Sequence, residues 1–145
     1  MDLTAAQQLI GKWWVNYDEG QFEVLDSLVT DDVTFSCRTD TGDHPYESFI
    51  AATVNGRADL DAYHREHRSG SPYPLRHNAT NIHITGEDGG DTQVRAYLFV
   101  TDMADGKPSP LSSGIIDFSL RATDDGPRVA GLRVVLDWAA TKEWA

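Results

Sequence analysis

Four long strand-like runs fill the second half of the chain and constrain its fold more than any other feature. Apolar and polar residues alternate along the runs, as expected for strands with one buried face, and the runs are residues 76–84, 92–102, 111–122 and 128–138. Clusters of Gly, Asp and Pro separate them, and these are the residues of tight turns. Successive strands joined by short turns predict a long antiparallel meander.

The first half of the chain carries helical spacing instead. Apolar residues recur at helical intervals after a capping-box pattern that starts at Thr4, and Gly20 supplies a stop. Helices followed by a strand meander predict an α+β fold, with helices packed on one face of a curved, mixed, mostly antiparallel sheet. The segments predicted in this half are a helix over 4–19, a shorter helix over 22–29, a strand over 33–37, a short helix over 46–54 and a longer helix over 57–67.

The length and charge of the chain argue against several classes of protein. Its 145 residues suit one domain, residues 1–145. The net charge of -11 and the lack of a basic run argue against nucleic acid as a partner. The start of the chain lacks the features of a signal peptide, and no apolar stretch is long enough to span a membrane. We therefore expect a cytoplasmic protein, in which Cys37, the single cysteine, forms no internal disulfide.

The run 76–84 has one unusually polar face. A polar face of this kind is either a solvated surface of the sheet or the lining of a wet pocket. In the second case a histidine becomes a candidate acid or base, because imidazole titrates near neutral pH. Since side chains alternate between the two faces of a strand, one face carries His77, Ala79, Asn81 and His83, and the other carries Thr80, Ile82 and Ile84.

The order of these elements, ending in the run from Val129 to Trp138, resembles the SnoaL-like branch of the nuclear transport factor 2-like (NTF2-like) superfamily. The resemblance spans nearly the whole chain. It implies a cone-shaped α+β barrel with a deep apolar pocket for a small apolar molecule, usually in a homodimer. Members include cofactor-free dehydratases, isomerases, cyclases and epoxide hydrolases, as well as non-catalytic binders and the small subunits of ring-hydroxylating dioxygenases.

Within this superfamily the chain resembles the scytalone dehydratase type at three positions. Tyr17 and Asp18 match the Tyr-Asp pair at the end of that enzyme's first helix, and His77 matches its first active-site histidine. Cys37 stands where that type has a strand tyrosine. Asp102 falls near the position of its second histidine, where related bile-acid dehydratases place an aspartate. The resemblance therefore implies that Asp102 could partner His77.

The ketosteroid isomerase type offers a second comparison. The segment 115–118 resembles the one that carries its protonated aspartic acid, which donates to an oxyanion, and Asp117 takes that place here. Trp13 falls near that enzyme's oxyanion tyrosine, and Cys37 falls where its proton-abstracting aspartate stands, so the isomerase mechanism lacks its base. From these positions we expect Trp13, Cys37 and Asp117 to contact a bound molecule.

Most of these residues also have a plain structural interpretation. A tyrosine on an apolar stripe ordinarily belongs to the core, and an aspartate at a helix end ordinarily caps it. Asp102 can equally be a strand-end residue that starts a turn, and Asp117 a solvent-facing residue of a strand. His64 and His67 lie one helical turn apart and could touch a common metal, but no third ligand or His-Glu-x-x-His pattern accompanies them. No Gly-rich phosphate loop follows a strand, so we expect no metal and no nucleotide cofactor.

The residues together favour a cofactor-independent lyase or isomerase that acts on a small, mostly apolar, carbonyl-bearing molecule. Removing a proton beside a carbonyl needs a base, and the developing oxyanion needs a hydrogen-bond donor. We expect His77 to be the base, Tyr17 the donor, and Asp18 or Asp102 the group that orients the histidine. The alternative is a non-catalytic module of the same fold that binds a small ligand or assembles with another subunit.

Overall fold

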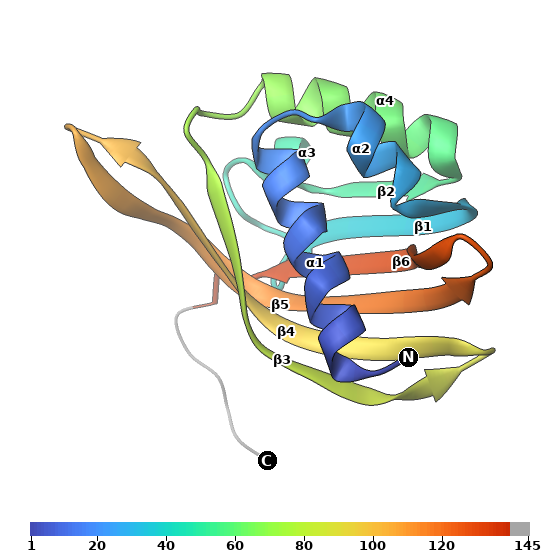
Figure 1. Cartoon of the computed structure of the whole chain (residues 1–145). Helices are drawn as coiled ribbons and strands as arrows, with labels where there is room; N and C mark the ends of the chain where they lie inside the picture. Colours follow the sequence, from blue (N-terminus) through green and yellow to red (C-terminus); the bar gives the residue numbers. More distant parts are fainter. Residues whose placement is uncertain (140–145) are drawn as a thin grey trace, which may run out of the picture.

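The computed structural model describes residues 1–139 as a layer of helices, formed mainly by α1 and α4, against one face of a six-stranded sheet (Figure 1). Within this part of the chain, no helix is long and apolar enough to cross a membrane. The elements, in chain order, are α1 (Leu3–Asp18), α2 (Phe22–Ser27), β1 (Val29–Thr39), α3 (Glu47–Ile50), β2 (Ala52–Asn55), α4 (Arg57–Ser69), β3 (Arg76–Asp88), β4 (Asp91–Ala104), β5 (Lys107–Thr123) and β6 (Gly126–Leu136).

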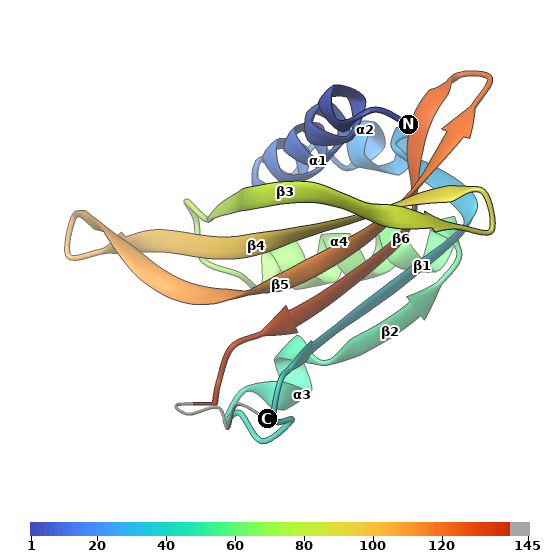
Figure 2. The same ribbon diagram turned by 90° about the horizontal axis from the view of Figure 1, so that it is seen from below.

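The sheet has the strand order β2-β1-β6-β5-β4-β3. Strands β1 and β6 run parallel, in a register that places Phe35 beside Leu132, and the other neighbouring strands are antiparallel. Figure 2 shows that the sheet is strongly twisted and curved and does not close on itself. The predicted α+β fold, with helices on one face of a curved, mostly antiparallel sheet, is therefore confirmed.

The four strand-like runs of the second half are strands β3 to β6, with ends that differ from the prediction by a few residues. The prediction was wrong over residues 46–54, where the structure has the short helix α3 followed by the strand β2. Ala52 and Val54 pack against the core, whereas Thr53 and Asn55 face outward. Pairing with the free edge of β1 makes residues 52–55 a strand. The sequence does not predict this, because the apolar spacing of so short a stretch does not distinguish a helix from a strand.

Helix α1 places the end of its buried stripe beside the start of β3. Its N-cap is Asp2 rather than Thr4 of the capping-box pattern, and the Asp2 carboxylate accepts a hydrogen bond from Ala5 N at 2.8 Å. Because α1 packs along β3, its last two residues, Tyr17 and Asp18, meet that strand. The buried apolar residues of the helix are Ala6, Leu9, Ile10, Trp13, Trp14 and Tyr17.

The polar face predicted for β3 does not persist along the strand. His77 contacts α1, but Asn81 has a positive φ of 56° at an irregularity in the β3–β4 pairing. A bulge of this kind shifts the alternation of side chains between the two faces. Beyond it Ile82 packs against the core and His83 is exposed. The prediction that His83 shares a face with His77 was therefore wrong.

Strands β4 and β5 continue beyond the rest of the sheet as a two-stranded arm (Figure 2). Strand β3 starts opposite Thr101, and β6 ends opposite Gly114, so beyond these positions β4 and β5 pair only with each other within residues 1–139. Met103 is exposed on this arm, and Asp102 pairs with Ser109 within it. The arm therefore carries Asp102 away from the packed core of the sheet.

The close approach of β5 and β6 requires a glycine at position 114. A Cβ added to Gly114 would lie 2.3 Å from the carbonyl oxygen of Val135, which belongs to the paired backbone. We expect Gly114→Ala to lower the free energy of unfolding by about 2–3 kcal/mol. The matched control is Gly11→Ala in α1, where a Cβ meets nothing within 4 Å and helix propensity predicts a gain of about 0.5–1 kcal/mol. Urea unfolding measures both changes, and a Gly114→Ala protein as stable as the parent would contradict the prediction.

Candidate active site

The end of α1 and the start of β3 bring Asp18 and His77 into direct contact. Nδ1 of His77 lies 2.5 Å from Oδ1 of Asp18, and the backbone N–H of His77 donates to Asp18 Oδ2 at 2.8 Å. The side chain of Asp18 is 5% exposed and that of His77 is 11% exposed. Against an ionised carboxylate, which only accepts hydrogen bonds, Nδ1 carries the proton, and in a neutral ring Nε2 then keeps its lone pair. The contact gives His77 the tautomer of a base.

Aromatic rings hold the imidazole of His77 in its plane. Trp14 stacks on it with centroids 4.5 Å apart and an interplanar angle of 7°, and Tyr17 meets it edge-on at 5.3 Å. The indole Nε1 of Trp14 is itself buried and has no hydrogen-bond partner among the described residues. With the two hydrogen bonds to Asp18, these contacts leave the His77 ring little freedom to rotate.

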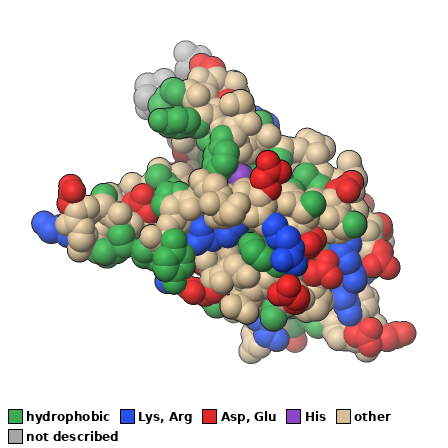
Figure 3. Space-filling view, turned by 90° about the horizontal axis from the view of Figure 1, so that it is seen from above, with side chains coloured by type: hydrophobic (Ala, Val, Ile, Leu, Met, Phe, Trp, Pro, Cys, Tyr) green, Lys and Arg blue, Asp and Glu red, His purple; other side chains and the backbone are tan. Residues whose placement is uncertain are grey.

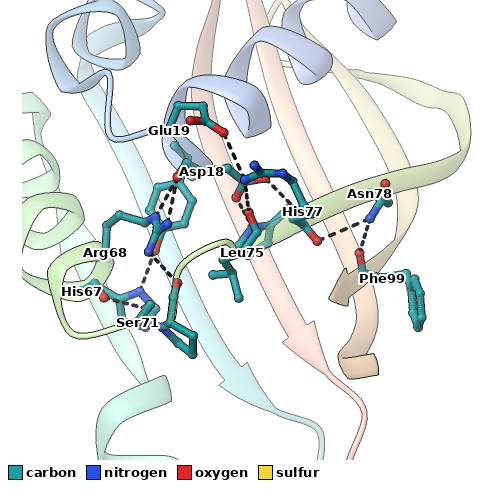
Figure 4. A network of polar contacts seen from close by, with 12 residues as sticks. Asp18, Glu19, His67, Arg68, Ser71, Leu75, His77, Asn78 and Phe99 are labelled. Carbon is teal, nitrogen blue, oxygen red and sulfur yellow. Dashed lines mark hydrogen bonds and ion pairs between the residues drawn. The ribbon is translucent and has the colours of Figure 1, made fainter. Parts of the chain in front are cut away.

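Arg68 of α4 fixes the main chain at Asp18. Its Nε and Nη2 donate to the carbonyl oxygen of Asp18 at 3.0 and 2.9 Å, and its Nη1 donates to the carbonyl oxygen of Pro72 at 2.9 Å. Figure 4 shows Arg68 reaching from α4 to the end of α1, where Asp18 faces His77. The last carbonyl groups of a helix lack helical partners, so the buried guanidinium caps α1. Arg68 thereby sets the position of the Asp18 carboxylate.

A second polar contact joins α1 to α4 beside this pair. Tyr17 Oη lies 2.7 Å from Nδ1 of His67. The His67 ring stacks between Phe49, at 4.6 Å, and Tyr63, at 5.3 Å. Burial raises the pKa of Tyr17 above its ordinary value and lowers the pKa of His67 below its own. Both groups are therefore mainly uncharged at neutral pH.

His64 lies deeper in the core, where its ring packs against Trp13, Tyr17 and Phe35. Burial lowers its pKa from 6.5 to about 4. Between these two values the unfolded chain binds a proton that the folded chain does not. Stability that is present above pH 6.5 is therefore lost as the pH falls toward 4, by about 3 kcal/mol.

This difference predicts how substitution of His64 changes the response to acid. The substitution His64→Phe keeps an aromatic ring in the core. Between pH 7 and pH 4 we expect the free energy of unfolding to fall by about 3 kcal/mol less in His64→Phe than in the parent. His83→Phe is the control, because His83 is exposed and should leave the pH dependence unchanged. Urea unfolding at several pH values measures the effect. The same pH dependence in His64→Phe as in the parent would show that His64 is not the group responsible.

Trp13 and Cys37 lie near these residues. Trp13 is 1% exposed and meets His64 and Phe118 edge-on, so it belongs to the core. Cys37 is half-buried on β1, and burial raises the pKa of its thiol to about 12. A thiol with so high a pKa stays protonated and is a poor nucleophile. Contact of either residue with a bound molecule stays a prediction.

Asp117 lies on the face of the sheet turned away from the helices. It accepts hydrogen bonds from Arg95 at 2.6 Å and from Arg133 at 2.7 Å, and the three side chains line an outer groove of about 590 Å³. Partial burial alone would raise the pKa of Asp117, but the two arginines outweigh it and hold the pKa below its ordinary value. The structure does not bring Asp117 together with His77, and an ionised carboxylate does not suit the protonated donor that the resemblance implied.

Asp102 is also separated from the pair. It lies two residues beyond Val100, which pairs with His77, and it belongs to the β4–β5 arm. Within residues 1–139 its carboxylate makes no hydrogen bond to His77, whose Nδ1 faces Asp18 instead. Of the two carboxylates expected to orient the histidine, the structure brings Asp18 to it.

The sequence did not predict two contacts near the candidate site, those of His67 and Arg68 with α1. The sequence singled out His67 only as one of two candidate metal ligands, one helical turn from His64. Among the described residues, no group of three or more His, Cys, Asp or Glu side chains is placed to hold a metal. The partners of His67 and Arg68 on α1 are 50 residues away in the chain, and no local pattern signals such contacts.

Comparisons with known proteins agree with the fold. Three similar solved structures are the beta subunit of benzoate 1,2-dioxygenase from Burkholderia mallei (20% identity, TM-score 0.72, covering 94% of this chain and 91% of that chain), an NTF2-like protein with a cystatin-like fold from Novosphingobium aromaticivorans (20%, 0.72, 92% and 80%), and a protein with a cystatin-like fold from Nostoc punctiforme (13%, 0.73, 92% and 90%). At these identities the likeness shows the fold alone.

Family membership rests on a separate comparison. No curated protein matches the chain. A family model described as the SnoaL-like domain matches residues 1–133, which is most of the chain. The protein therefore belongs to the SnoaL-like domain family of the NTF2-like superfamily.

Proposed function

We propose that this protein is a cofactor-independent lyase or isomerase that removes a proton beside the carbonyl group of a small, mostly apolar molecule. The observation that carries the proposal is the contact between His77 Nδ1 and the buried carboxylate of Asp18. It leaves Nε2 of His77 as a proton acceptor in a ring that is oriented and largely shielded from water. A base that works near neutral pH and is held by a carboxylate suits this reaction.

The proposed reaction uses three side chains. Nε2 of His77 takes the proton from the carbon beside the carbonyl group, and the electrons of the broken C–H bond move toward the carbonyl oxygen. Asp18 stabilises the imidazolium, and Tyr17, which packs against the His77 ring, donates a hydrogen bond to the developing oxyanion. In a lyase the enolate electrons then form a C=C bond, while a hydroxyl group on the next carbon of the substrate takes the proton from His77 and leaves as water. In an isomerase His77 returns the proton to a different carbon.

Exchange of hydrogen for deuterium beside a carbonyl group tests this base without the natural substrate. Cyclohexanone, acetophenone and 2-tetralone are incubated with the protein in D₂O, and ¹H NMR follows the loss of their α-hydrogen signals. We expect exchange above the buffer rate with at least one ketone, lost in His77→Ala and kept in the control His83→Ala. Exchange at the buffer rate with all three ketones, or exchange that survives in His77→Ala, would overturn the proposal.

We further propose a homodimer formed through the outer face of the sheet. Tyr97 and Ile115 pair across β4 and β5 on that face, Phe99 lies beside them, and all three are exposed in the single chain. Exposed apolar side chains clustered in this way are typical of association surfaces. Light scattering at micromolar concentration should report a dimer that Tyr97→Asp dissociates, whereas the control Val15→Asp, at an exposed site on α1, should leave it intact. A monomeric parent protein would refute this prediction.

A non-catalytic assembly module is the second candidate function. It is favoured by the likeness to a dioxygenase beta subunit and by the distribution of apolar side chains at the surface. Figure 3 shows hydrophobic side chains gathered toward the side from which the β4–β5 arm extends, and charged side chains toward the other side. Met103 and Leu111 are exposed in this region. A module of this kind should exchange no ketone hydrogens, so the deuterium experiment separates the two functions.

A further inference from the structure

The hydroxyl group of Tyr17 has one hydrogen, and His67 decides where that hydrogen points. Tyr17 Oη and His67 Nδ1 are 2.7 Å apart. If Nδ1 of a neutral ring carries no proton, it accepts the Tyr17 O–H, and the hydroxyl has no hydrogen left to donate elsewhere. If Nδ1 carries a proton, it donates to Oη, and the hydroxyl hydrogen is free for another oxygen atom. A protonated ring carries a proton on both nitrogens, so it always frees the hydroxyl.

We propose that His67 is a positioning residue that controls Tyr17 as a hydrogen-bond donor, so that protonation of His67 frees the Tyr17 hydroxyl to bind the oxyanion of a bound molecule. This inference rests on the proposed function, because it concerns the donor of that same site. It adds a second proton-handling pair, Tyr17 and His67, to the pair formed by Asp18 and His77.

The surroundings of His67 fix it in a position that suits this role. Its ring lies between the faces of Phe49 and Tyr63, and Ser71 Oγ donates to its backbone carbonyl at 2.7 Å (Figure 4). Tyr17 is 5% exposed, so water does not readily replace its partner. The titratable and charged groups around the pair are Tyr63, His64 and Arg68 on α4, Asp18 on α1, Cys37 on β1 and His77 on β3.

These surroundings set the direction of the pH dependence. Burial, followed by the neighbouring His77 and Arg68, lowers the pKa of His67 below its ordinary value of 6.5. The protonated form of His67, which always frees the Tyr17 hydroxyl, is therefore a minority at neutral pH, and its share grows by up to tenfold for each unit by which the pH falls toward the pKa. A base such as His77 must instead be neutral to accept a proton. The contribution of Tyr17 to the rate should thus increase as the pH falls.

NMR of the free protein tests the pair without any substrate. Long-range ¹H–¹⁵N spectra of the histidine rings are recorded from pH 4 to 8 for the parent and for Tyr17→Phe. We expect the Nδ1 resonance of His67 and its titration to change in Tyr17→Phe, while the exposed His83 stays the same. Tyr73→Phe is the control, because Tyr73 is exposed and its hydroxyl lies 3.3 Å from Glu19 instead. An Nδ1 resonance of His67 that is indifferent to Tyr17→Phe would overturn the inference.

The pH profile of deuterium exchange in 2-tetralone tests the consequence for catalysis. His67→Gln supplies an amide that can hold the Tyr17 hydroxyl but does not titrate, and melting temperature checks that it folds. We expect the ratio of parent rate to His67→Gln rate to increase by about fourfold to a hundredfold as the pH falls from 7 to 5, and no such change with the control His83→Gln. If the parent and His67→Gln have parallel pH profiles while exchange still depends on His77, the inference is overturned and the proposed function stands. If no ketone exchanges, the proposed function fails, and the NMR spectra still decide whether His67 governs the Tyr17 hydroxyl.

Discussion

Replacing His77 with alanine is expected to lower the rate of ketone deuterium exchange by two to four orders of magnitude. A positioned general base typically supplies this factor, which corresponds to roughly 3–5 kcal/mol in the activation barrier. Nε2 of His77 is the proton acceptor in the proposed reaction, and its partner Asp18 accepts hydrogen bonds from Nδ1 and from the backbone N–H. The backbone bond survives in His77→Ala, so the end of α1 keeps one of its contacts with β3.

The variant also removes the ring that stacks on Trp14, so stability has to be measured beside activity. Tyr17→Phe is the comparison, because it deletes one donor but keeps the aromatic packing, and its rate should fall less than that of His77→Ala. A purely structural histidine predicts the opposite pattern, in which His77→Ala changes the melting temperature and leaves exchange unchanged. Unchanged exchange in a folded His77→Ala protein would therefore exclude His77 as the base.

Replacing Asp18 with asparagine is expected to impair both stability and exchange. The Asp18 carboxylate is almost fully buried and accepts two hydrogen bonds from His77. An asparagine side chain can accept one of them, but its NH₂ group then faces the other donor. Leaving a buried donor without a partner costs about 1–3 kcal/mol. We therefore expect the free energy of unfolding to fall by about 2–3 kcal/mol, and exchange to fall about 10²-fold, because an amide does not favour the Nδ1-protonated tautomer of His77 as a carboxylate does.

Two other carboxylates provide matched controls for Asp18→Asn. Asp117→Asn alters the ion pairs of the outer sheet face and should leave exchange unchanged. Asp102→Asn tests the second carboxylate that the sequence had offered as the partner of His77, and we expect it to be silent as well. Urea unfolding and the ketone assay measure the three variants together. Loss of exchange in Asp102→Asn with normal exchange in Asp18→Asn would reverse the assignment of the orienting group.

The sequence by itself determined the layers of the fold and singled out residues that the proposed site uses. Alternating apolar residues identified β3 to β6, since a strand with one buried face has a period of two whatever it pairs with. The helical stripe of α1 predicted its buried face, and a family resemblance pointed to Tyr17, Asp18 and His77. The structure places Asp18 and His77 in direct contact, and their catalytic roles stay a prediction. Both results come from patterns confined to one element or from the order of the elements.

Only the tertiary structure decided the contacts that give these residues their chemistry. An irregularity at Asn81 turned His83 away from the face of His77, and pairing with β1 made residues 52–55 a strand. Asp117 faces two arginines on the outer side, and His67 meets Tyr17 across the packing of α1 and α4. The physical reason is the same in each case. A local pattern encodes which side of an element is buried, whereas strand register and the packing angle of α1 against α4 decide which distant donor and acceptor meet there.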